Sequence, residues 1–324
     1  MKELLRVEDL YVNFRTLWGV AKVLNGVNFT IKEGEIFGLV GETGCGKSVT
    51  ASTILRLLPP NAEVSGKIIF KGENLLEKSE EEMRKIRGKE ISIIFQDPMT
   101  SLNPLFKIRD QMIDIITLHN NVSKEEAEER AKDLLKSVGL PDPDRILNSY
   151  PHELSGGMRQ RVMIAMALSS NPSLLIADEP TTALDVTVQK QILNLILELK
   201  ETYNFSVLFI THDLGVVAEI CDRVGVMYAG NIVEIASTEE LFENPLHPYT
   251  KGLLSVVPDP RYKKKLKPLR GSVPSLINPP SGCRFHPRCN YATEICTKEK
   301  PKLSEYSPGH FVACHLYKGG TLDD

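Results

Sequence analysis

Short apolar runs and helically spaced apolar residues alternate along the first third of the chain. Residues 35–40 read Glu-Ile-Phe-Gly-Leu-Val, an apolar run with a glycine inside it and another just after it, which predicts a buried strand. Apolar side chains recur at helical spacing in residues 48–58, and the two prolines that follow predict the end of that helix. The β-branched residues 91–95 predict another strand. The pattern therefore indicates strand, loop, helix and strand in succession.

The middle of the chain changes to a polar, helical pattern. This pattern extends from Ile108 to about Val138 and includes an acidic stretch with alanines. Ser123 followed by Glu126 has the spacing of a capping box, which predicts that a helix begins there. We therefore expect a helical insertion at about residues 98–165, within an α/β core.

Strands and helices alternate again in the second half of the chain. We expect strands at residues 173–177, 206–210 and 223–228, and a helix at about 186–202. Strands that alternate with helices favour a mainly parallel sheet that is covered on both faces.

The last quarter of the chain has a different character. Beyond about residue 236 prolines become frequent and the periodicity fades. A length of 324 residues is enough for two domains, or for one large domain with an appendage. The sequence thus predicts a main domain at 1–235 and a C-terminal extension at 236–324.

The charge balance and the apolar runs exclude several classes of protein. With 39 basic and 42 acidic residues, the chain has no general attraction for nucleic acid. No apolar run reaches the roughly 18 residues of a membrane-spanning helix, and residues 1–6 lack the plan of a secretory signal. We expect a cytosolic chain that does not itself span a membrane.

Residues 41–48 fit the phosphate-loop pattern G-x-x-x-x-G-K-S between a predicted strand and a predicted helix. In such a loop successive backbone N–H groups and the helix N-terminus bind phosphate. Lys47 is then expected to reach the terminal phosphates, and the Ser48 hydroxyl to bind Mg²⁺. The expected nucleotide-binding residues of this segment are Gly41, Glu42, Thr43, Gly44, Cys45, Gly46, Lys47, Ser48 and Val49.

A second candidate site follows the apolar strand at residues 174–178. Asp178 ends this strand and Glu179 comes directly after it. A carboxylate oxygen suits a hard cation, so we expect Asp178 to bind Mg²⁺. We expect Glu179 to act as the general base that polarises the attacking water.

Taken with the segment Leu-Ser-Gly-Gly-Met at residues 154–158, these motifs resemble the ATP-binding cassette (ABC) ATPases over about residues 5–245. The resemblance implies an α/β cassette with a RecA-like parallel core, an antiparallel N-terminal β region and a helical insertion. It also implies that Ser155, Gly156 and Gly157 contact the γ-phosphate of an ATP held by a second cassette. The residue types agree, because a serine and two glycines at a helix N-terminus expose N–H groups to an anion.

The same resemblance assigns roles to three further polar residues. Asp185 corresponds to the D-loop aspartate at the seam between two cassettes, and His212 to the switch histidine that touches the γ-phosphate. Gln96 corresponds to the Q-loop glutamine that meets Mg²⁺ and the attacking water. Together with Glu179, His212 and Gln96 form the expected catalytic set.

An aromatic ring from the N-terminal strands stacks on adenine in this family. Phe14 matches the family spacing best, whereas Tyr11 and Trp18 are competitors, and core packing is the alternative role for Phe14.

Three further segments resemble the ABC subclass that imports dipeptides, oligopeptides and nickel. They are the run at residues 96–104, which is longer than the general family needs, the segment His-Pro-Tyr-Thr at residues 247–250, and the proline- and cysteine-containing tail at residues 279–289. The resemblance implies two membrane permease subunits, an extracytoplasmic solute-binding protein and a second cassette, which is a paralogue or a second copy. It places the chain at the cytoplasmic face of the membrane. The alternatives are import of nickel or another small solute, or a soluble ABC ATPase that remodels nucleic acid or ribosomes.

Four of the six cysteines crowd the tail, with 5, 6 and 17 residues between them. In a reducing compartment such a cluster favours a metal over disulfides. The spacing lacks the close cysteine pairs of zinc sites, so we favour a structural 4Fe-4S cluster over Zn²⁺. The expected ligands are Cys283, Cys289, Cys296 and Cys314, with ATP and Mg²⁺ as the other cofactors of the chain.

Overall fold

A computed structural model of the protein describes residues 2–96, 101–182, 184–255 and 270–317. The chain forms two compact units. The first contains residues 1–77 and 210–324, and the second contains residues 78–209. The first unit is therefore discontinuous in sequence.

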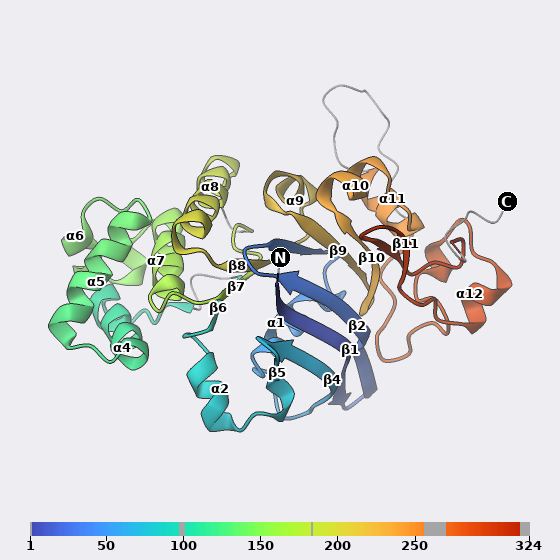
Figure 1. Ribbon diagram of the computed structural model, residues 1–324, viewed down its shortest axis with the longest axis horizontal. Helices are drawn as coiled ribbons and strands as arrows, with labels where there is room; N and C mark the ends of the chain where they lie inside the picture. Colours follow the sequence, from blue (N-terminus) through green and yellow to red (C-terminus); the bar gives the residue numbers. More distant parts are fainter. Residues whose placement is uncertain (1, 97–100, 183, 256–269, 318–324) are drawn as a thin grey trace. The chain divides into compact units, whose positions relative to one another are not determined.

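An antiparallel sheet makes up the N-terminal part of the first unit (Figure 1). Its strand order is β2-β1-β4-β5. Apolar residues on β1 are buried at Leu5, Val7, Leu10 and Val12, and this spacing gives the sheet one face for a core. The strands are β1 (Glu3–Thr16), β2 (Gly19–Lys32), β4 (Ala62–Phe70) and β5 (Glu73–Asn74), and the 3₁₀ helix η1 (Leu75–Glu77) follows them.

The first unit also contains five strands in the order β11-β12-β10-β9-β3. All five residues of β3 are buried, as expected for a strand in a parallel pair with both faces covered. β3 pairs in parallel with β9, and the remaining neighbours pair antiparallel. These strands are β3 (Ile36–Val40), β9 (Arg223–Tyr228), β10 (Asn231–Ser237), β11 (Ser304–Ser307) and β12 (His310–Val312).

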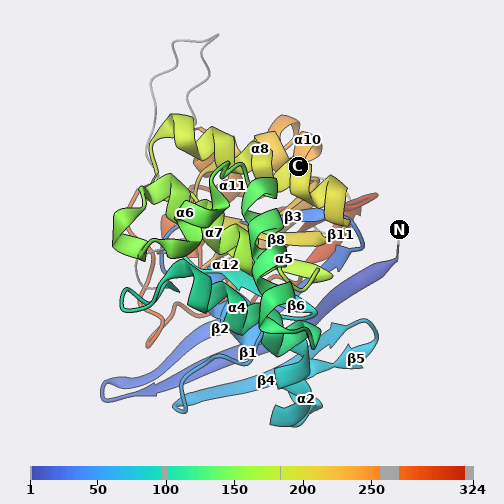
Figure 2. The same ribbon diagram turned by 90° about the vertical axis from the view of Figure 1, so that its left-hand side faces the viewer.

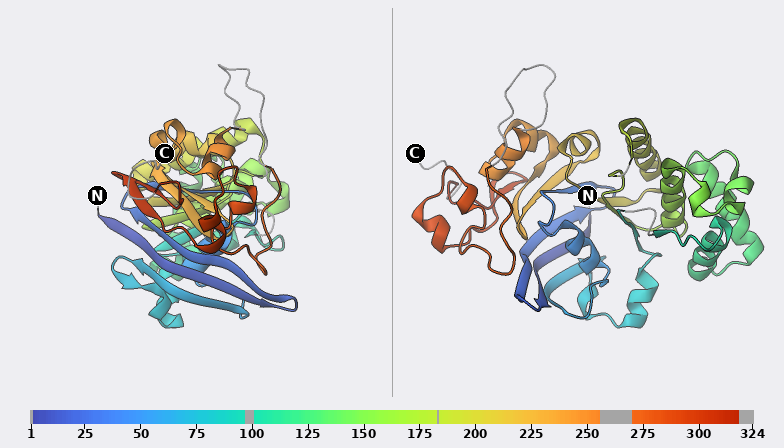
Figure 3. Two further views of the ribbon diagram at one scale, coloured as in Figure 1. Left: turned by 90° about the vertical axis from the view of Figure 1, so that its right-hand side faces the viewer. Right: turned by 180° about the vertical axis from the view of Figure 1, so that it is seen from behind.

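The C-terminal extension joins this sheet through β12, which pairs with β10 (Figure 3). The helices of the first unit are α1 (Lys47–Ile54), α9 (Leu214–Ile220), α10 (Thr238–Glu243), α11 (Pro248–Leu254), η3 (His286–Arg288) and α12 (Glu294–Lys298). The predicted domain boundary at residue 235 falls inside β10, and it stays a prediction.

The second unit combines parallel strands with a helical region (Figure 2). β6 pairs in parallel with β7, and β8 lies on the other side of β7. The strands are β6 (Ile91–Ile94), β7 (Leu174–Asp178) and β8 (Ser206–Thr211), whose last two residues belong to the first unit. The helices are α2 (Glu80–Ile86), α4 (Ile108–Asn120), α5 (Lys124–Ser137), α6 (Pro143–Asn148), η2 (Pro151–Glu153), α7 (Gly156–Leu168) and α8 (Val186–Tyr203).

The predicted capping box begins α5. The Ser123 side chain accepts from the Glu126 N–H, and the Glu126 carboxylate accepts from the Ser123 N–H. The buried face of α5 repeats every four residues, at Ala127, Ala131 and Leu135, which fits a helix packed along one stripe.

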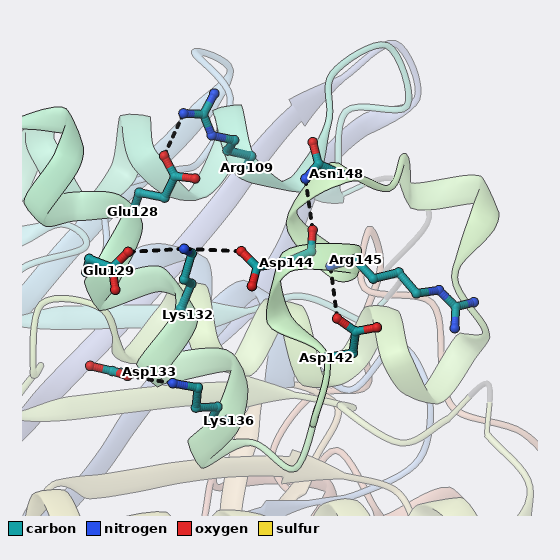
Figure 4. A network of polar contacts seen from close by, with 10 residues as sticks. All are labelled: Arg109, Glu128, Glu129, Lys132, Asp133, Lys136, Asp142, Asp144, Arg145 and Asn148. Atoms are coloured by element: carbon teal, nitrogen blue, oxygen red, sulfur yellow. Dashed lines mark hydrogen bonds and ion pairs between the residues drawn. The ribbon is translucent and has the colours of Figure 1, made fainter.

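A polar network covers the outside of this helical region (Figure 4). Lys132 lies 3.1 Å from both Glu129 and Asp144, and Arg109 pairs with Glu128 at 2.6 Å. Exposed ion pairs contribute about 0–1 kcal/mol each, so the apolar stripe of α5 contributes more to stability than these pairs do.

The predicted fold class is confirmed. The antiparallel N-terminal sheet, the parallel pairs β3–β9 and β6–β7, and the helices α4 to α6 correspond to the parts of an ABC cassette. Within the described ranges, no helix is both long enough and apolar enough to cross a membrane.

Candidate nucleotide site

The phosphate loop connects β3 to α1, as the sequence predicts. Two of its glycines are required by their surroundings. A Cβ on Gly41 would lie 2.1 Å from the Met227 carbonyl oxygen, and one on Gly46 would lie 2.8 Å from Leu24 Cδ2. Both glycines also have positive φ angles, of 155° and 108°, which residues with side chains rarely adopt. Backbone contacts and conformation together therefore define the loop.

The Lys47 side chain folds back over the loop. Its Nζ donates to the carbonyl oxygen of Gly41 at 2.7 Å and to that of Glu42 at 3.3 Å. Lys47 is buried, whereas Thr43, Gly44 and Ser48 are exposed. The ammonium group is thus held at the loop, where it can meet a phosphate.

Glu42 connects the loop to residues of the extension. Its N–H donates to Tyr249 Oη at 3.0 Å, and its carboxylate accepts two hydrogen bonds from Arg288, at 2.7 and 3.0 Å. These hydrogen bonds raise the pKa of Arg288 above its usual value. Sequence reasoning missed both partners, since nothing local relates residue 42 to residues more than 200 positions later.

Aromatic side chains pack close to these contacts. Tyr228 and Tyr249 have ring centroids 4.6 Å apart, and Phe285 lies 5.1 Å from Tyr228. Burial raises the pKa of Cys45 in the loop, and its carbonyl accepts from the Gly230 N–H at 2.8 Å. The buried thiol agrees with a packing role for the Cys45 side chain.

His212 follows β8 and precedes α9, the place that the sequence predicts for it. It is exposed. Asp213 after it caps α9 by accepting from the Gly215 N–H at 2.8 Å. The turn that presents the histidine is therefore fixed by its neighbour.

In the second unit, the structure brings Gln96 and Glu179 together. Gln96 Nε2 donates to Glu179 Oε2 at 2.9 Å, and Thr182 Oγ1 donates to the same oxygen at 2.9 Å. Asp178 and Glu179 are both buried at the end of β7, and Glu179 has a positive φ of 48°. Thr182 was missed by sequence reasoning, although it lies only three residues after Glu179.

The Leu-Ser-Gly-Gly-Met segment begins α7. Ser155 caps this helix by accepting from the Met158 N–H at 3.3 Å. A Cβ on Gly157 would lie 2.9 Å from Val188 Cγ1 of α8, so the glycine permits close packing there. Asp185 caps α8 by accepting from the Thr187 and Val188 N–H groups, at 3.1 and 3.0 Å. This capping role was also missed.

The three aromatic candidates for adenine stacking lie on or between β1 and β2. Phe14 is half-buried, with Ala21 and Ala62 opposite it on the neighbouring strands. Tyr11 is exposed, and Trp18 lies exposed in the turn between the two strands. Their roles stay predictions, as does that of Val49, which is half-buried in α1.

The donor groups in each unit suit ATP and Mg²⁺. The first unit provides the phosphate loop with Lys47 and Ser48. The second provides Asp178, Glu179 and Gln96, whose carboxylate and amide oxygens are typical Mg²⁺ ligands. Residues 97–100, which belong to the run at 96–104 singled out in the sequence, lie outside the described residues.

The structure does not support the predicted metal centre in the tail. The four cysteines carry free thiols, and no three His, Cys, Asp or Glu side chains in the described parts of the chain are placed to hold a metal ion. Burial raises the pKa of Cys283 and Cys289, and that of Cys314 to about 12. Neither the favoured 4Fe-4S cluster nor the alternative Zn²⁺ is therefore supported by the structure.

Two family comparisons cover most of the chain. Residues 24–182 match the ABC transporter family, and residues 233–296 match the C-terminal region of oligopeptide/dipeptide transporters. The second match contains Cys283, Cys289 and Cys296 and includes the segment that supplies Arg288.

Full-length relatives agree with these matches. The chain is 56% identical to a probable peptide ABC transporter ATP-binding protein of Sinorhizobium fredii, over 96% of this chain and 94% of the relative. It is 50% identical to the oligopeptide transport ATP-binding protein OppD of Bacillus subtilis, over 97% of this chain and 88% of that protein. It is 49% identical to the dipeptide transport ATP-binding protein DppD of the same species, over 98% and 95%.

A solved structure agrees on the fold. The ATP-binding cassette MJ0796, in a dimeric post-hydrolysis state with ADP and phosphate, superposes with a TM-score of 0.65 at 30% identity. The superposition covers 72% of this chain and 99% of that one. The chain therefore belongs to the ABC transporter family, among the ATP-binding subunits of oligopeptide and dipeptide transporters.

Proposed function

We propose that this protein is the ATPase subunit that energises import of small peptides across the cytoplasmic membrane. The observation that carries the proposal is the match to the ABC transporter family at residues 24–182, followed in the same chain by the match to the oligopeptide/dipeptide transporter C-terminal region at residues 233–296. The relatives named for peptide transport span nearly the whole chain.

In the proposed reaction the phosphate loop and Lys47 bind the phosphates of ATP. Glu179 accepts a proton from the attacking water, whose oxygen forms a bond to the γ-phosphorus while the bond to the β-phosphate oxygen breaks. Bound Mg²⁺ would be held by Ser48, Gln96 and Asp178, and it would neutralise charge that develops on the phosphates. His212 is proposed to contact the γ-phosphate.

Gln96 and Thr182 act as positioning residues for the base. Both donate to Glu179 Oε2, so they fix the plane of the carboxylate. This orientation matters because a general base must lie within hydrogen-bond reach of the proton that it removes.

The proposed working form is a head-to-tail pair of cassettes. Ser155, Gly156 and Gly157 of one cassette contact the γ-phosphate of ATP bound to the other, and Asp185 lies at the seam. The work comes from the higher affinity of ATP for the closed pair than for the open one. The second cassette is a paralogue or another copy of this chain, and its closure moves the two permeases that receive solute from an extracytoplasmic binding protein.

We place the protein at the cytoplasmic face of the membrane, in contact with the permeases. Two apolar side chains in the second unit support this placement, since Leu105 is 80% exposed and Phe106 is 52% exposed. They are the apolar side chains that we expect a permease to cover.

Substitution of the base tests the proposed chemistry. Glu179→Gln should leave ATP binding intact, abolish hydrolysis and trap a pair of cassettes, which size-exclusion chromatography with ATP would detect. Glu198→Gln on α8 is a control for the loss of one carboxylate. Hydrolysis by Glu179→Gln at the parental rate would remove Glu179 from its assigned role.

Reconstitution tests the transport function. Copurification with two permeases, followed by ATP-dependent uptake of a labelled dipeptide into vesicles, is the expected result. ATP hydrolysis without peptide uptake in the presence of both permeases would contradict the assignment of a peptide as the solute.

We also propose that Cys283, Cys289, Cys296 and Cys314 bind a structural 4Fe-4S cluster. Each thiolate would bind a different iron atom, so the sulfurs can lie farther apart than around one ion. In support, burial raises the pKa of Cys314 and the charges of Cys283, Cys289 and Cys296 raise it further. The Cys283 N–H also donates to the Cys296 carbonyl oxygen at 2.8 Å. Absence of both iron and sulfide from anaerobically purified protein would exclude the cluster.

A further inference from the structure

A cavity of about 710 Å³ lies within the first unit, apart from the phosphate loop. Its walls come from β1, β2, β9 and β10, and from three parts of the extension, at residues 282–285, 300–303 and 311–313. Pockets for small organic ligands commonly enclose about 300–1,000 Å³. None of the catalytic, phosphate-binding or Mg²⁺-binding residues of the proposed ATPase reaction lines it, although Tyr11, a competitor for adenine stacking, and Cys283, a proposed cluster ligand, do.

Most of the lining surface is apolar. Phe29 and Val233 are buried, and Leu303 and Phe311 are half-buried. These side chains come from both the cassette strands and the extension, so the cavity exists only where the two pack together. A ligand with an apolar body would bury against them.

Two of the basic side chains in the lining already have carboxylate partners. Arg6 lies 3.0 Å from Glu8, and Arg223 lies 3.0 Å from Glu35. These carboxylates balance the two charges, although Arg6 Nε makes no hydrogen bond with any described residue, so neither arginine is the main anion-binding group.

Arg284 is different, because no carboxylate in the described part of the chain pairs with it. It is 5% exposed, and both of its hydrogen bonds come from Nη1, to the carbonyl oxygens of Lys22 and Ala229. Nη2 and Nε have no partner among the described residues. A buried guanidinium without an anion is costly, and an anion in the cavity would relieve that cost.

Two further cations line the same cavity. Lys300 donates to the Asn25 carbonyl oxygen and Lys302 is exposed, and neither has an ion-pair partner within the described ranges. Burial lowers the pKa of Lys300, and the charge of Asp9, an acidic residue in the lining, opposes that shift. The Asp9 carboxylate accepts from Asn28 Nδ2 at 3.0 Å. The excess positive charge is modest, which suits an anion of charge −1 better than a nucleotide.

We propose that this cavity binds a small organic carboxylate with an apolar body. The carboxylate meets Arg284, whose planar fork matches the two oxygens, and Lys300 adds a second cation. The body lies against Phe29, Val233 and Phe311. Two sources share this chemistry, namely the C-terminus of a short apolar peptide and an aliphatic acid, and a free peptide amine would in addition meet Asp9.

Calorimetric titration of the full-length protein distinguishes the sources and tests the site. The probes are the dipeptide Leu-Leu, its C-terminal amide, and octanoate, each with and without saturating ATP. We expect Leu-Leu to bind at least about tenfold more tightly than the amide, because only its carboxylate can accept charge-assisted hydrogen bonds from Arg284. If octanoate binds and Leu-Leu does not, the same site is supported and its ligand is an aliphatic acid.

Equal affinity for Leu-Leu and for its C-terminal amide, when both bind, overturns the proposal. The absence of binding by all three probes at millimolar concentration also overturns it. ATP binding is measured on the same samples. Because it involves other residues, intact ATP binding with no carboxylate binding rejects this site and leaves the proposed ATPase function standing.

Three variants locate the binding site. Arg284→Gln and Lys300→Gln should each weaken carboxylate binding by about tenfold and leave ATP binding unchanged. Lys298→Gln is the matched control, since this exposed lysine pairs with Glu294 and does not line the cavity. Lys300→Gln keeps the test decisive if Arg284→Gln fails to fold. A loss in Lys298→Gln equal to that in Lys300→Gln would place the ligand elsewhere.

Discussion

Arg288 and Glu42 form a two-pronged ion pair, although they are 246 positions apart in the sequence. Nη1 donates to Oε2 at 2.7 Å and Nη2 donates to Oε1 at 3.0 Å. The Arg288 side chain is only 6% exposed. Since Glu42 is the second residue of the phosphate loop, a residue of the C-terminal extension holds the loop that binds nucleotide.

Loss of this ion pair should weaken ATP binding. Arg288→Gln leaves the Glu42 carboxylate without its partner, close to the phosphates, and frees the loop to move. We expect about a tenfold higher Kd for ATP, since tenfold corresponds to about 1.4 kcal/mol. Fluorescent-nucleotide titration measures it.

A double variant separates the two causes. In Glu42→Gln/Arg288→Gln no unpaired carboxylate remains, so part of the ATP affinity should return, and the coupling energy of the cycle measures the pair. Parental ATP affinity in Arg288→Gln alone would mean that the extension does not support the loop.

Gly157→Ala should reduce stability where Gly156→Ala does not. A Cβ at Gly157 would lie 2.9 Å from Val188 Cγ1, whereas one at Gly156 would lie 3.6 Å from Leu184 Cδ2, an ordinary contact. Overpacking costs about 1–3 kcal/mol, and alanine in a helix returns up to about 1 kcal/mol. Urea unfolding should show Gly157→Ala less stable than the parent, with recovery in Gly157→Ala/Val188→Ala. Equal stability of the two alanine variants would contradict the close contact with Val188.

Loss of the negative charge of Glu234 on β10 should destabilise the folded protein. Its buried carboxylate accepts from the N–H groups of Leu246 and His247, at 2.7 and 2.9 Å, and lies 2.8 Å from His310 Nε2. In Glu234→Gln an amide N–H must face one of these donors, and we expect a loss of about 3 kcal/mol of unfolding free energy. Glu239→Gln, at an exposed carboxylate on α10, is the control, and a loss of the same size there would refute this account.

His247 should make the protein sensitive to acid. Burial lowers its pKa from 6.5 to about 4, while the charge of Glu234 opposes the shift. Between these values the unfolded chain binds more protons than the folded one, so the stability present above about pH 6.5 is lost as the pH falls towards 4. Between pH 7 and pH 5 the loss should be about 2 kcal/mol.

The variant His247→Asn keeps an acceptor for the Tyr249 N–H, which donates to His247 Nδ1 at 3.0 Å. Its unfolding free energy, measured in urea at pH 7 and at pH 5, should fall less than that of the parent. The same fall in both proteins would assign the acid sensitivity to other groups.

Local signals in the sequence predicted much of the fold. The buried runs that became β3 and β7, and the capping box at Ser123, depend on residues close together in the chain, and all three are confirmed. The strand β10 was missed. Glu234 interrupts its apolar pattern, and no local signal shows that the N–H groups of Leu246 and His247 satisfy this carboxylate.

The candidate site divides in the same way. Lys47, Glu179 and Gln96 carry motifs with their own chemistry. Arg288 and Tyr249 lie in segments that resemble the importer subclass, but no local pattern predicts that they contact Glu42. The role of Thr182 could have been predicted from the sequence, because its hydroxyl lies three residues after the carboxylate that it orients. The N-cap at Asp185 could also have been predicted, since an aspartate directly before a helical run is a typical N-cap.

The pairing of β3 with β9 determines the order in which parts of the chain can fold during synthesis on the ribosome. Phe37 pairs with Arg223, so at about 5–20 residues per second the newly made β3 waits roughly 10–40 seconds for its parallel neighbour. The continuous unit at residues 78–209 emerges complete within that interval. The middle of the chain can therefore fold first, while the nascent phosphate loop and its apolar strand need protection from misassembly until the later strands arrive.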